Sequence, residues 1–197
     1  MKALKICVGI VLAAVILVAV LAGVLLSVLA KRPAVPEDYT ATVETGGPLE
    51  ERYLAMGGHD VSYFESGAMM SFKKYEIHYP SDIASMDDPL PAVVFVNGTG
   101  VTGSKYPALQ KHLASWGFIT IATEEEYAWN GFSAEMCVRY LELLNQYEGE
   151  VEGGANPLLG KVDLGRVGIT GTPRAVSGSS TLSLIRSTPT VTRRLSS

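Results

Sequence analysis

The chain has 197 residues and a formal net charge of -4, from 16 Lys and Arg against 20 Asp and Glu. This length fits one domain, and the acidic balance leaves no basic surface for a nucleic-acid partner. There are two cysteines, and Cys7 lies inside an apolar run, so the chain is not a disulfide-stapled domain. We interpret Cys137 as a small buried hydrophobe rather than a reactive thiol.

The N-terminal region is an uncharged apolar run, ICVGIVLAAVILVAVLAGVLLSVLA, at residues 6–30. A helix of about 20 apolar residues crosses the hydrocarbon core of a bilayer, so the run predicts one transmembrane helix with membrane lipid as its partner. The alternative is a cleaved signal peptide, because residues 28–30 include small side chains, but a signal core has only roughly 7–15 residues. We therefore expect residues 1–30 to be an anchor or a signal segment.

Basic residues on both sides of this run give a weak indication of its orientation. Lys2, Lys5 and the α-amine precede the run, and Lys31 and Arg32 follow it. Cytoplasmic flanks carry the excess of Lys and Arg. The slight excess on the N-terminal side favours a single-pass membrane protein with an extracytoplasmic globular part, or a secreted protein if the segment is cleaved.

The rest of the chain begins as a polar spacer and continues as alternating strands and helices. Residues 31–58 are polar and contain three prolines and a Gly-Gly pair, which is typical of a linker. Residues 59–171 form the predicted domain. We expect strands at 73–80, within 92–100, at 118–123 and at 166–171, and helices at 104–117 and 133–150. This order predicts an α/β fold with a mostly parallel sheet, flanking helices and right-handed crossovers.

Both predicted helices carry an apolar stripe at spacings of three and four residues, and Gly117 ends the first helix. The stripe of the first helix is Tyr106, Leu109, Leu113 and Trp116, and that of the second is Met136, Tyr140, Leu143 and Leu144. Residues 172–197 are rich in Ser, Thr and Arg and show no period. They predict a disordered segment, or an out-of-frame tail.

Three features between residues 73 and 171 resemble the α/β-hydrolases. They are the strand followed by NGTG at 97–100, the helix ending in LASWGF at 113–118, and the strand RVGITG at 166–171. The narrower resemblance is to dienelactone hydrolases, chlorophyllase-like proteins and polyester-hydrolase-like esterases. It implies the N-terminal half of an α/β-hydrolase fold, and ester hydrolysis by a serine nucleophile with no cofactor.

The resemblance also implies where the site would lie. In this family the loop after the VVFV strand donates one backbone N–H to the oxyanion hole. Here that position is Thr99, with Gly98 and Gly100 giving the backbone room; the alternative is an ordinary tight turn. Trp129 and Asn130 correspond to a pocket-lining loop after the next strand, or they only pack at its rim.

The remaining titratable residues indicate no metal or cofactor site. We interpret the acidic run at 124–126 as a solvated loop. His59, His78 and His112 lack the spacing of metal ligands, and His112 is expected to be exposed on the polar side of its helix. Neither His78 nor His112 fits the family's base, because the triad runs Ser, Asp, His in chain order. A metal- or cofactor-dependent enzyme therefore has no supporting motif.

The sequence departs from the family where the nucleophile turn should follow Gly171. Pro173 stands at the nucleophile's position, and proline has no nucleophilic group. The family's downstream acid and base have no counterpart before Ser197, so we expect no catalytic residues in the chain as printed. If Arg174 is encoded by AGG, one C inserted after the Gly171 codon permits the reading Gly-His-Ser-Gln-Gly-Gly, which is the missing motif. The alternative is that residues 172–197 are the natural tail and that the shifted frame yields this motif by chance.

These observations predict a membrane-anchored α/β-hydrolase-family protein that is ancestrally a serine carboxylic-ester hydrolase. The chain as printed is expected to be catalytically incomplete, with an ester substrate only if the full frame is restored. The alternative is a non-catalytic, membrane-anchored binding or structural module built on the half-sheet.

Overall fold

The computed structural model describes residues 2–69, 72–128 and 130–171, and the chain divides into two units. The first unit is Met1–Ala34, and the second begins at Val35. The expected pocket residue Trp129, the expected elbow position Pro173 and the expected tail at 172–197 lie outside the described residues.

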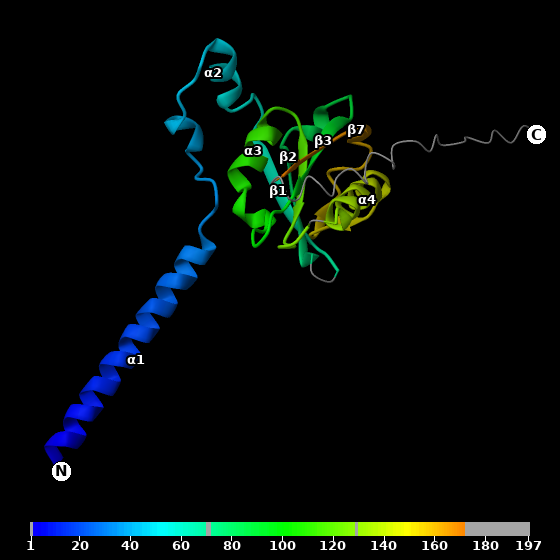
Figure 1. Cartoon of the computed structure of the whole chain (residues 1–197). Coiled ribbons are helices and arrows are strands. Elements are labelled where there is room, and N and C mark those ends of the chain that lie inside the picture. Colours follow the sequence, from blue (N-terminus) through cyan, green and yellow to red (C-terminus); the bar gives the residue numbers. More distant parts are fainter. Residues whose placement is uncertain (1, 70–71, 129, 172–197) are drawn as a thin grey trace, which may run out of the picture. The chain divides into compact units, whose positions relative to one another are not determined.

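The first unit is one long helix, α1 (Lys2–Lys31), which is blue in Figure 1. Its segment Gly9–Lys31 contains an 18-residue window with a mean hydropathy of 3.1 and is long and apolar enough to span a membrane or to act as a signal sequence. The Ser27 hydroxyl donates to the Gly23 carbonyl at 2.9 Å, so this polar group is satisfied inside the apolar stretch. The expected apolar helix is therefore confirmed.

The second unit alternates strands and helices along the chain. Its helices are η1 (Tyr39–Thr42), α2 (Pro48–Leu54), η3 (Ile83–Ser85), η4 (Gly103–Lys105), α3 (Pro107–Ser115) and α4 (Phe132–Gln146), of which the η elements are 3₁₀ turns. Its strands are β1 (Val61–Gly67), β2 (Lys74–Pro80), β3 (Leu90–Val96), β4 (Ile119–Thr123), β5 (Glu150–Val151), β6 (Gly154–Ala155) and β7 (Val162–Gly171).

Five of these strands form one sheet in the order β1-β2-β4-β3-β7, and β5 and β6 form a separate hairpin. β3 is parallel to both of its neighbours, β4 and β7, whereas β2 is antiparallel to β1 and β4. Parallel neighbours need a crossover connection, which α3 supplies between β3 and β4. The expected α/β architecture with flanking helices is confirmed, with β2 as the one reversed strand.

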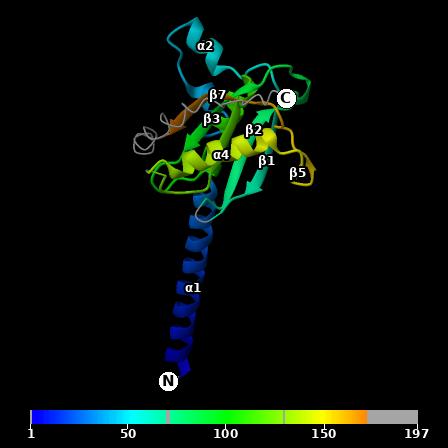
Figure 2. The ribbon, with the colours of Figure 1, turned by 90° about the vertical axis from the view of Figure 1, so that its right-hand side faces the viewer.

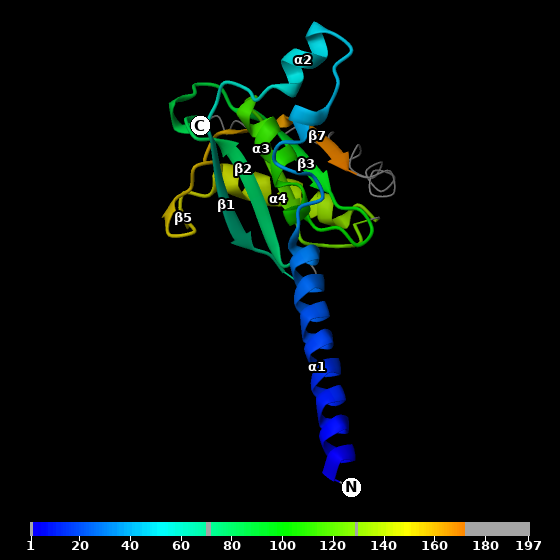
Figure 3. The same ribbon diagram turned by 90° about the vertical axis from the view of Figure 1, so that its left-hand side faces the viewer.

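The helices α3 and α4 cover opposite faces of this sheet. Figure 2 shows α4 crossing in front of the strands, and Figure 3, from the opposite side, shows α3 in front of them. The chain path explains this arrangement. β4 and β7 lie on opposite sides of β3, so right-handed crossovers in opposite directions place their helices on opposite faces.

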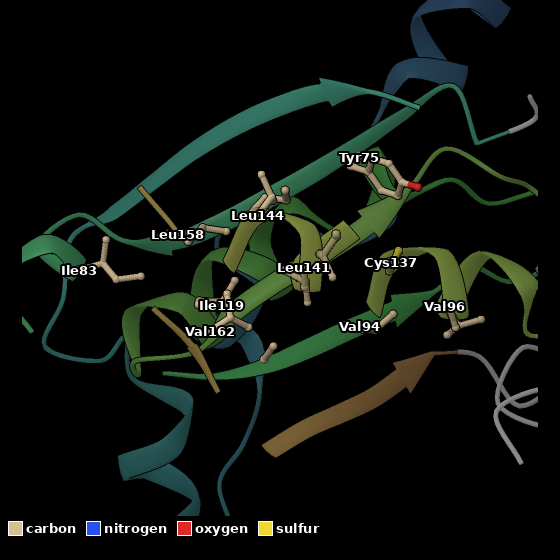
Figure 4. Close-up of a cluster of buried hydrophobic side chains, with 14 of the residues drawn as sticks. Tyr75, Ile83, Val94, Val96, Ile119, Cys137, Leu141, Leu144, Leu158 and Val162 are labelled. Atoms are coloured by element: carbon tan, nitrogen blue, oxygen red, sulfur yellow. The ribbon is translucent and has the colours of Figure 1, made fainter. Parts of the chain in front are cut away.

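The apolar core lies between the sheet and α4 (Figure 4). Its members include Tyr75, Ile77, Val94, Val96, Ile119, Ile121, Cys137, Leu141 and Leu144. The rings of Tyr75 and Tyr140 stack with centroids 4.2 Å apart. Burying one Leu or Ile side chain contributes about 1.5–3 kcal/mol, so this layer is the main source of stability. Cys137 is a buried member of it, as the sequence predicted.

The face of the sheet beneath α3 is lined by buried polar side chains. Glu76 and His78 of β2 are 4% and 3% exposed, and Gln110 of α3 and Thr120 of β4 are fully buried. The Glu76 carboxylate lies 2.7 Å from the Lys74 ammonium, yet burial raises the pKa of Glu76 above its ordinary value. The side chains of β2 therefore alternate between apolar and polar as expected, but the polar side chains are buried as well.

The outer side of α3 is covered by the segment that precedes β1. His112 Nε2 lies 2.8 Å from the Tyr53 carbonyl oxygen, and the Trp116 indole N–H donates to the Ala55 carbonyl at 3.0 Å. The expectation that His112 is exposed is therefore wrong. Its exposure is 8%, because this part of the chain packs over the polar side of the helix.

The expected apolar stripes describe the two helices only in part. All four stripe residues of α3 are half-buried, whereas its fully buried residues are small or polar: Ala108, Gln110, His112, Ala114 and Ser115. In α4 the core face includes Cys137, Leu141 and Leu144, and Leu143 is 56% exposed. A helix covered on two sides, such as α3, does not show a single apolar face.

The last strand is longer and less regular than the sequence predicted. β7 begins at Val162, ahead of the expected start at 166. Pro91 pairs with Asp163, but Ala92 pairs with Val167, so residues 164–166 bulge out of the ladder. The helix α2, the strand β1 and the β5–β6 hairpin were not predicted from the sequence.

Candidate functional site

The carboxyl ends of β3 and β7 lie side by side at one edge of the sheet. Val96, the last residue of β3, is the Cα partner of Gly171, the last residue of β7. The next strand in the chain after β3 is β4 on one side, whereas β7 lies on the other, so the strand order reverses at β3. Open α/β sheets bind ligands outside the strand carboxyl ends at such a reversal. This edge is the candidate site.

Asn97 fixes the loop that follows β3. Its side chain is 1% exposed, and its amide nitrogen donates to the Thr123 carbonyl at 2.5 Å and to the Glu125 carbonyl at 2.8 Å. The Gly100 N–H donates to the Glu126 carbonyl at 2.9 Å. The loops after β3 and β4 are therefore joined at both ends of the sequence NGTG.

Thr99 lies in a tight turn within this loop. The Val101 N–H donates to the Gly98 carbonyl at 3.2 Å, and Gly100 has a φ of 71°, as the third residue of a type II turn requires. Thr99 is exposed, and no described residue accepts a hydrogen bond from its backbone N–H. The turn thus leaves a backbone donor available to solvent at the carboxyl end of β3.

Gly171 closes the other side of the site by a close approach of two backbones. A Cβ atom at this position would lie 2.3 Å from the Val96 carbonyl oxygen, a distance that real Cβ atoms do not adopt. Glycine is therefore needed where β7 ends against β3.

The acidic run after β4 is partly buried and supports the neighbouring turn. The Glu124 carboxylate accepts the Ser104 backbone N–H at 2.7 Å and the Ser104 hydroxyl at 3.1 Å. Glu126 lies 3.9 Å from the Lys73 ammonium. The loop expected at 124–126 is present, and Glu124 within it also holds η4 in place; no sequence spacing indicated this contact.

Asn130 has a local structural role in the described chain. Its side chain is exposed, and its carbonyl oxygen accepts the Phe132 N–H at 3.0 Å at the start of α4. An Asn side chain that accepts the N–H two residues along the chain forms an Asx turn, which is a common local motif. The role of Asn130 in lining a pocket stays a prediction.

The histidines have partners away from any nucleophile. His59 Nδ1 lies 3.1 Å from the Asp82 carboxylate, and His112 contacts a backbone carbonyl. Among the described residues no histidine ring bonds a serine hydroxyl or a cysteine thiol, as a nucleophile–base pair would, and no group of three His, Cys, Asp or Glu could hold a metal ion. Burial raises the pKa of the Cys137 thiol, which disfavours the reactive thiolate.

The arrangement can therefore offer a backbone donor to an anionic group at the carboxyl edge of the sheet. The contacts of Asn97 and Glu124 could not be predicted from the sequence, because their partners are distant along the chain. No protein-family model matches this sequence, and no curated protein matches it either.

Proposed function

We propose that this chain carries the N-terminal half of an α/β-hydrolase fold and derives from a membrane-anchored serine carboxylic-ester hydrolase. The observation that carries this proposal is the pairing of Val96 with Gly171 at the carboxyl edge of the sheet. An oxyanion hole of this family takes one N–H from the loop after the third strand and one from the residue after the nucleophile. These two strand ends are neighbours, as that arrangement requires.

The free N–H of Thr99 is the donor that the proposal assigns to this hole. In the complete enzyme a serine just after Gly171 would attack the ester carbonyl, and the Thr99 N–H would stabilise the developing oxyanion. The serine would be acylated as the alcohol leaves, and water would then cleave the acyl–serine bond to release the carboxylic acid and regenerate the serine, with a histidine base and an acid from later in the chain. The acyl-enzyme route needs no metal or cofactor.

Pro173 stands where that serine is needed, so the chain as printed should not turn over esters. We propose that one missing base explains this. The test is to sequence the DNA around codons 171–198 and read it in all three forward frames. The expected result is an AGG codon at Arg174 and an open shifted frame that encodes the elbow. Any other arginine codon, or early stop codons in that frame, would contradict the frameshift.

A second test compares the printed chain with the chain whose frame is restored, both in detergent. The restored chain should hydrolyse short acyl esters and react with a fluorophosphonate probe, and the printed chain should do neither. Replacing the restored serine with alanine should abolish both signals. A restored chain that folds cooperatively but resists acylation would show that the proposed function is wrong while the fold is right.

Thr99 variants in the restored chain test the assigned donor. Thr99→Pro removes the backbone N–H, which should lower kcat/KM by about 100–1000-fold, the typical cost of one oxyanion donor. Thr99→Ala keeps the N–H and is the matched control, so its kcat/KM should stay close to that of the parent. Equal losses in both variants would place the effect in the side chain and contradict the assignment.

The second candidate function is a non-catalytic module, and the continuous core of the second unit favours it. A module that binds a partner should unfold cooperatively as printed, whereas a broken hydrolase should not. Denaturant unfolding of residues 31–197, followed by fluorescence and by circular dichroism, distinguishes the two. Coincident transitions support the module, and a broad or probe-dependent loss of signal supports the broken hydrolase.

A further inference from the structure

The turn after β3 contains an acceptor sequence for N-linked glycans. Asn97, Gly98 and Thr99 match the pattern Asn-x-Ser/Thr, in which the middle residue is not proline. The chain has four asparagines, at positions 97, 130, 145 and 156, and only Asn97 has a Ser or Thr two residues later. The sequence therefore offers one such acceptor, and the structure decides when it can react.

Attachment of an N-linked glycan is a group transfer to the asparagine side chain. The amide nitrogen forms a bond to the first carbon of the sugar, and the bond between that carbon and the phosphate of a polyprenyl-diphosphate-linked oligosaccharide breaks. The polyprenyl diphosphate leaves, and the amide nitrogen loses one proton. The reaction therefore needs an accessible amide nitrogen and room for a sugar beside it.

The folded chain meets neither of these requirements. Asn97 is 1% exposed, and its amide nitrogen donates to the Thr123 carbonyl at 2.5 Å and to the Glu125 carbonyl at 2.8 Å. A glycan would replace one of the two amide hydrogens, so one of these carbonyls would lose its donor. Thr99 is exposed, so the burial of Asn97 closes the acceptor, and the burial of Thr99 does not.

The partners of Asn97 follow it at a distance along the chain. Thr123 and Glu125 lie 26 and 28 residues after Asn97. The N-terminal part of a chain is synthesised first, so Asn97 is made before either of its partners. A growing or unfolded chain thus presents the acceptor with a free amide nitrogen.

We propose that Asn97 accepts a glycan only while the chain is unfolded, and that glycan attachment and formation of the candidate loop exclude one another. A chain whose loop forms first keeps Asn97 unmodified. A chain that is modified first cannot use Asn97 to join the end of β3 to the loop after β4. Such transfers take place on the extracytoplasmic side of a membrane, where the proposed topology puts the second unit. The inference does not rest on the proposed hydrolase function.

In vitro glycosylation of the full chain tests this inference. The chain in detergent is incubated with a single-subunit oligosaccharyltransferase and a lipid-linked oligosaccharide, beside a tryptic digest of the same chain. The digest presents the acceptor unfolded, because Lys74 and Lys105 flank it. Occupancy at Asn97, measured by mass spectrometry, should be at least about tenfold lower in the intact chain, because the loop must open before Asn97 can react.

Two variants control this comparison. Val43→Asn creates a second acceptor sequence, with Thr45 two residues later, in an exposed loop between η1 and α2. Its occupancy should be about equal in the intact chain and in the digest. Thr99→Ala removes the hydroxyl that the transferase requires and leaves the Asn97 side chain in place, so the digest of this variant should not be modified at Asn97.

Three results would overturn the proposal. Equal occupancy of Asn97 in the intact chain and in the digest would show that the fold does not close the acceptor. A digest that stays unmodified at Asn97 would show that the sequence is no acceptor at all. An intact chain that is modified neither at Asn97 nor in Val43→Asn would show that the enzyme rejects the whole chain, so that the burial of Asn97 is not the cause.

Discussion

At the scale of single residues, Asn97 is the side chain that ties the candidate loop to the rest of the sheet. It donates two hydrogen bonds, one to the carbonyl of Thr123 at the end of β4 and one to the carbonyl of Glu125, while it is almost fully buried. Its carbonyl oxygen is buried and has no partner among the described residues. A buried polar group without a partner is costly, so this oxygen offsets part of the stabilisation from the two donated bonds.

Asn97→Asp should lower the free energy of unfolding by about 2–4 kcal/mol. The substitution removes both donors, leaves two carbonyls unpaired and buries a carboxylate. Asn145→Asp is the matched control: Asn145 accepts the Val162 N–H through its carbonyl oxygen, and aspartate keeps that acceptor. The control should change stability by less than about 1 kcal/mol. Denaturant unfolding of the full chain in detergent measures both, and equal losses would contradict the assigned role of Asn97.

His78 should make stability depend on pH. Burial, together with the charge of Lys111, lowers the pKa of His78 to about 4, and the Tyr63 ring packs with its centroid 4.6 Å from the His78 ring. The unfolded chain binds this proton near the ordinary pKa of about 6.5, so the contribution of His78 is full above pH 6.5 and is lost as the pH falls toward 4. The raised pKa of Glu76 acts in the opposite direction, because protonation of the buried carboxyl stabilises the folded state as the pH falls.

A comparison with His78→Gln isolates this effect, because Glu76 is present in both chains. The difference in unfolding free energy between wild type and variant should narrow by about 3 kcal/mol between pH 7 and pH 4. Unfolding curves recorded at half-unit pH steps measure it. Parallel pH profiles for the two chains would mean that His78 does not titrate differently in the folded state.

At the scale of elements, α3 is held between two layers rather than on one. Its inner side covers polar residues of β2 and β4, and its outer side carries hydrogen bonds from the segment before β1. The Gly57 N–H also donates to the Ser115 hydroxyl at 2.8 Å. This segment therefore contributes to the folded unit.

A chain that starts at residue 59 should be less stable than one that starts at residue 35. The shorter chain loses three hydrogen bonds to α3 and exposes His112 and Ser115, which should cost about 2–4 kcal/mol at about 0.5–1.5 kcal/mol per bond. The midpoint of urea unfolding compares the two. Identical midpoints would show that the segment adds nothing to stability.

At the scale of the whole molecule, α1 decides where the protein resides. We propose a single-pass anchor with the second unit outside the cytoplasm. The full chain should resist alkaline extraction from membranes, and a chain lacking residues 1–34 should be released. Intact-mass analysis should find the N-terminal segment retained, and protease added outside sealed cells should digest the second unit. A mature mass that lacks residues 1–30 would identify a cleaved signal instead.

Much of the fold could be predicted because its signals are local. The apolar run predicted α1, and the apolar strands and intervening helices predicted the parallel arrangement of β3, β4 and β7. Short elements were missed because their stability comes from partners: α2 has no buried residues, and β1 is set by its pairing with β2. The burial of His112 was missed for the same reason, since its cover comes from a distant segment.

The sequence by itself determined the apolar helix, the α/β class and the glycine-rich turn after β3, because hydrophobic periodicity and backbone freedom are properties of neighbouring residues. Only the tertiary structure decided that the ends of β3 and β7 adjoin, and that β2 is reversed. It also decided that Asn97 braces the candidate loop and that Glu124 braces η4. Strand order and side-chain hydrogen bonds over 20 or more residues depend on which surfaces pack together, and no local pattern encodes that choice.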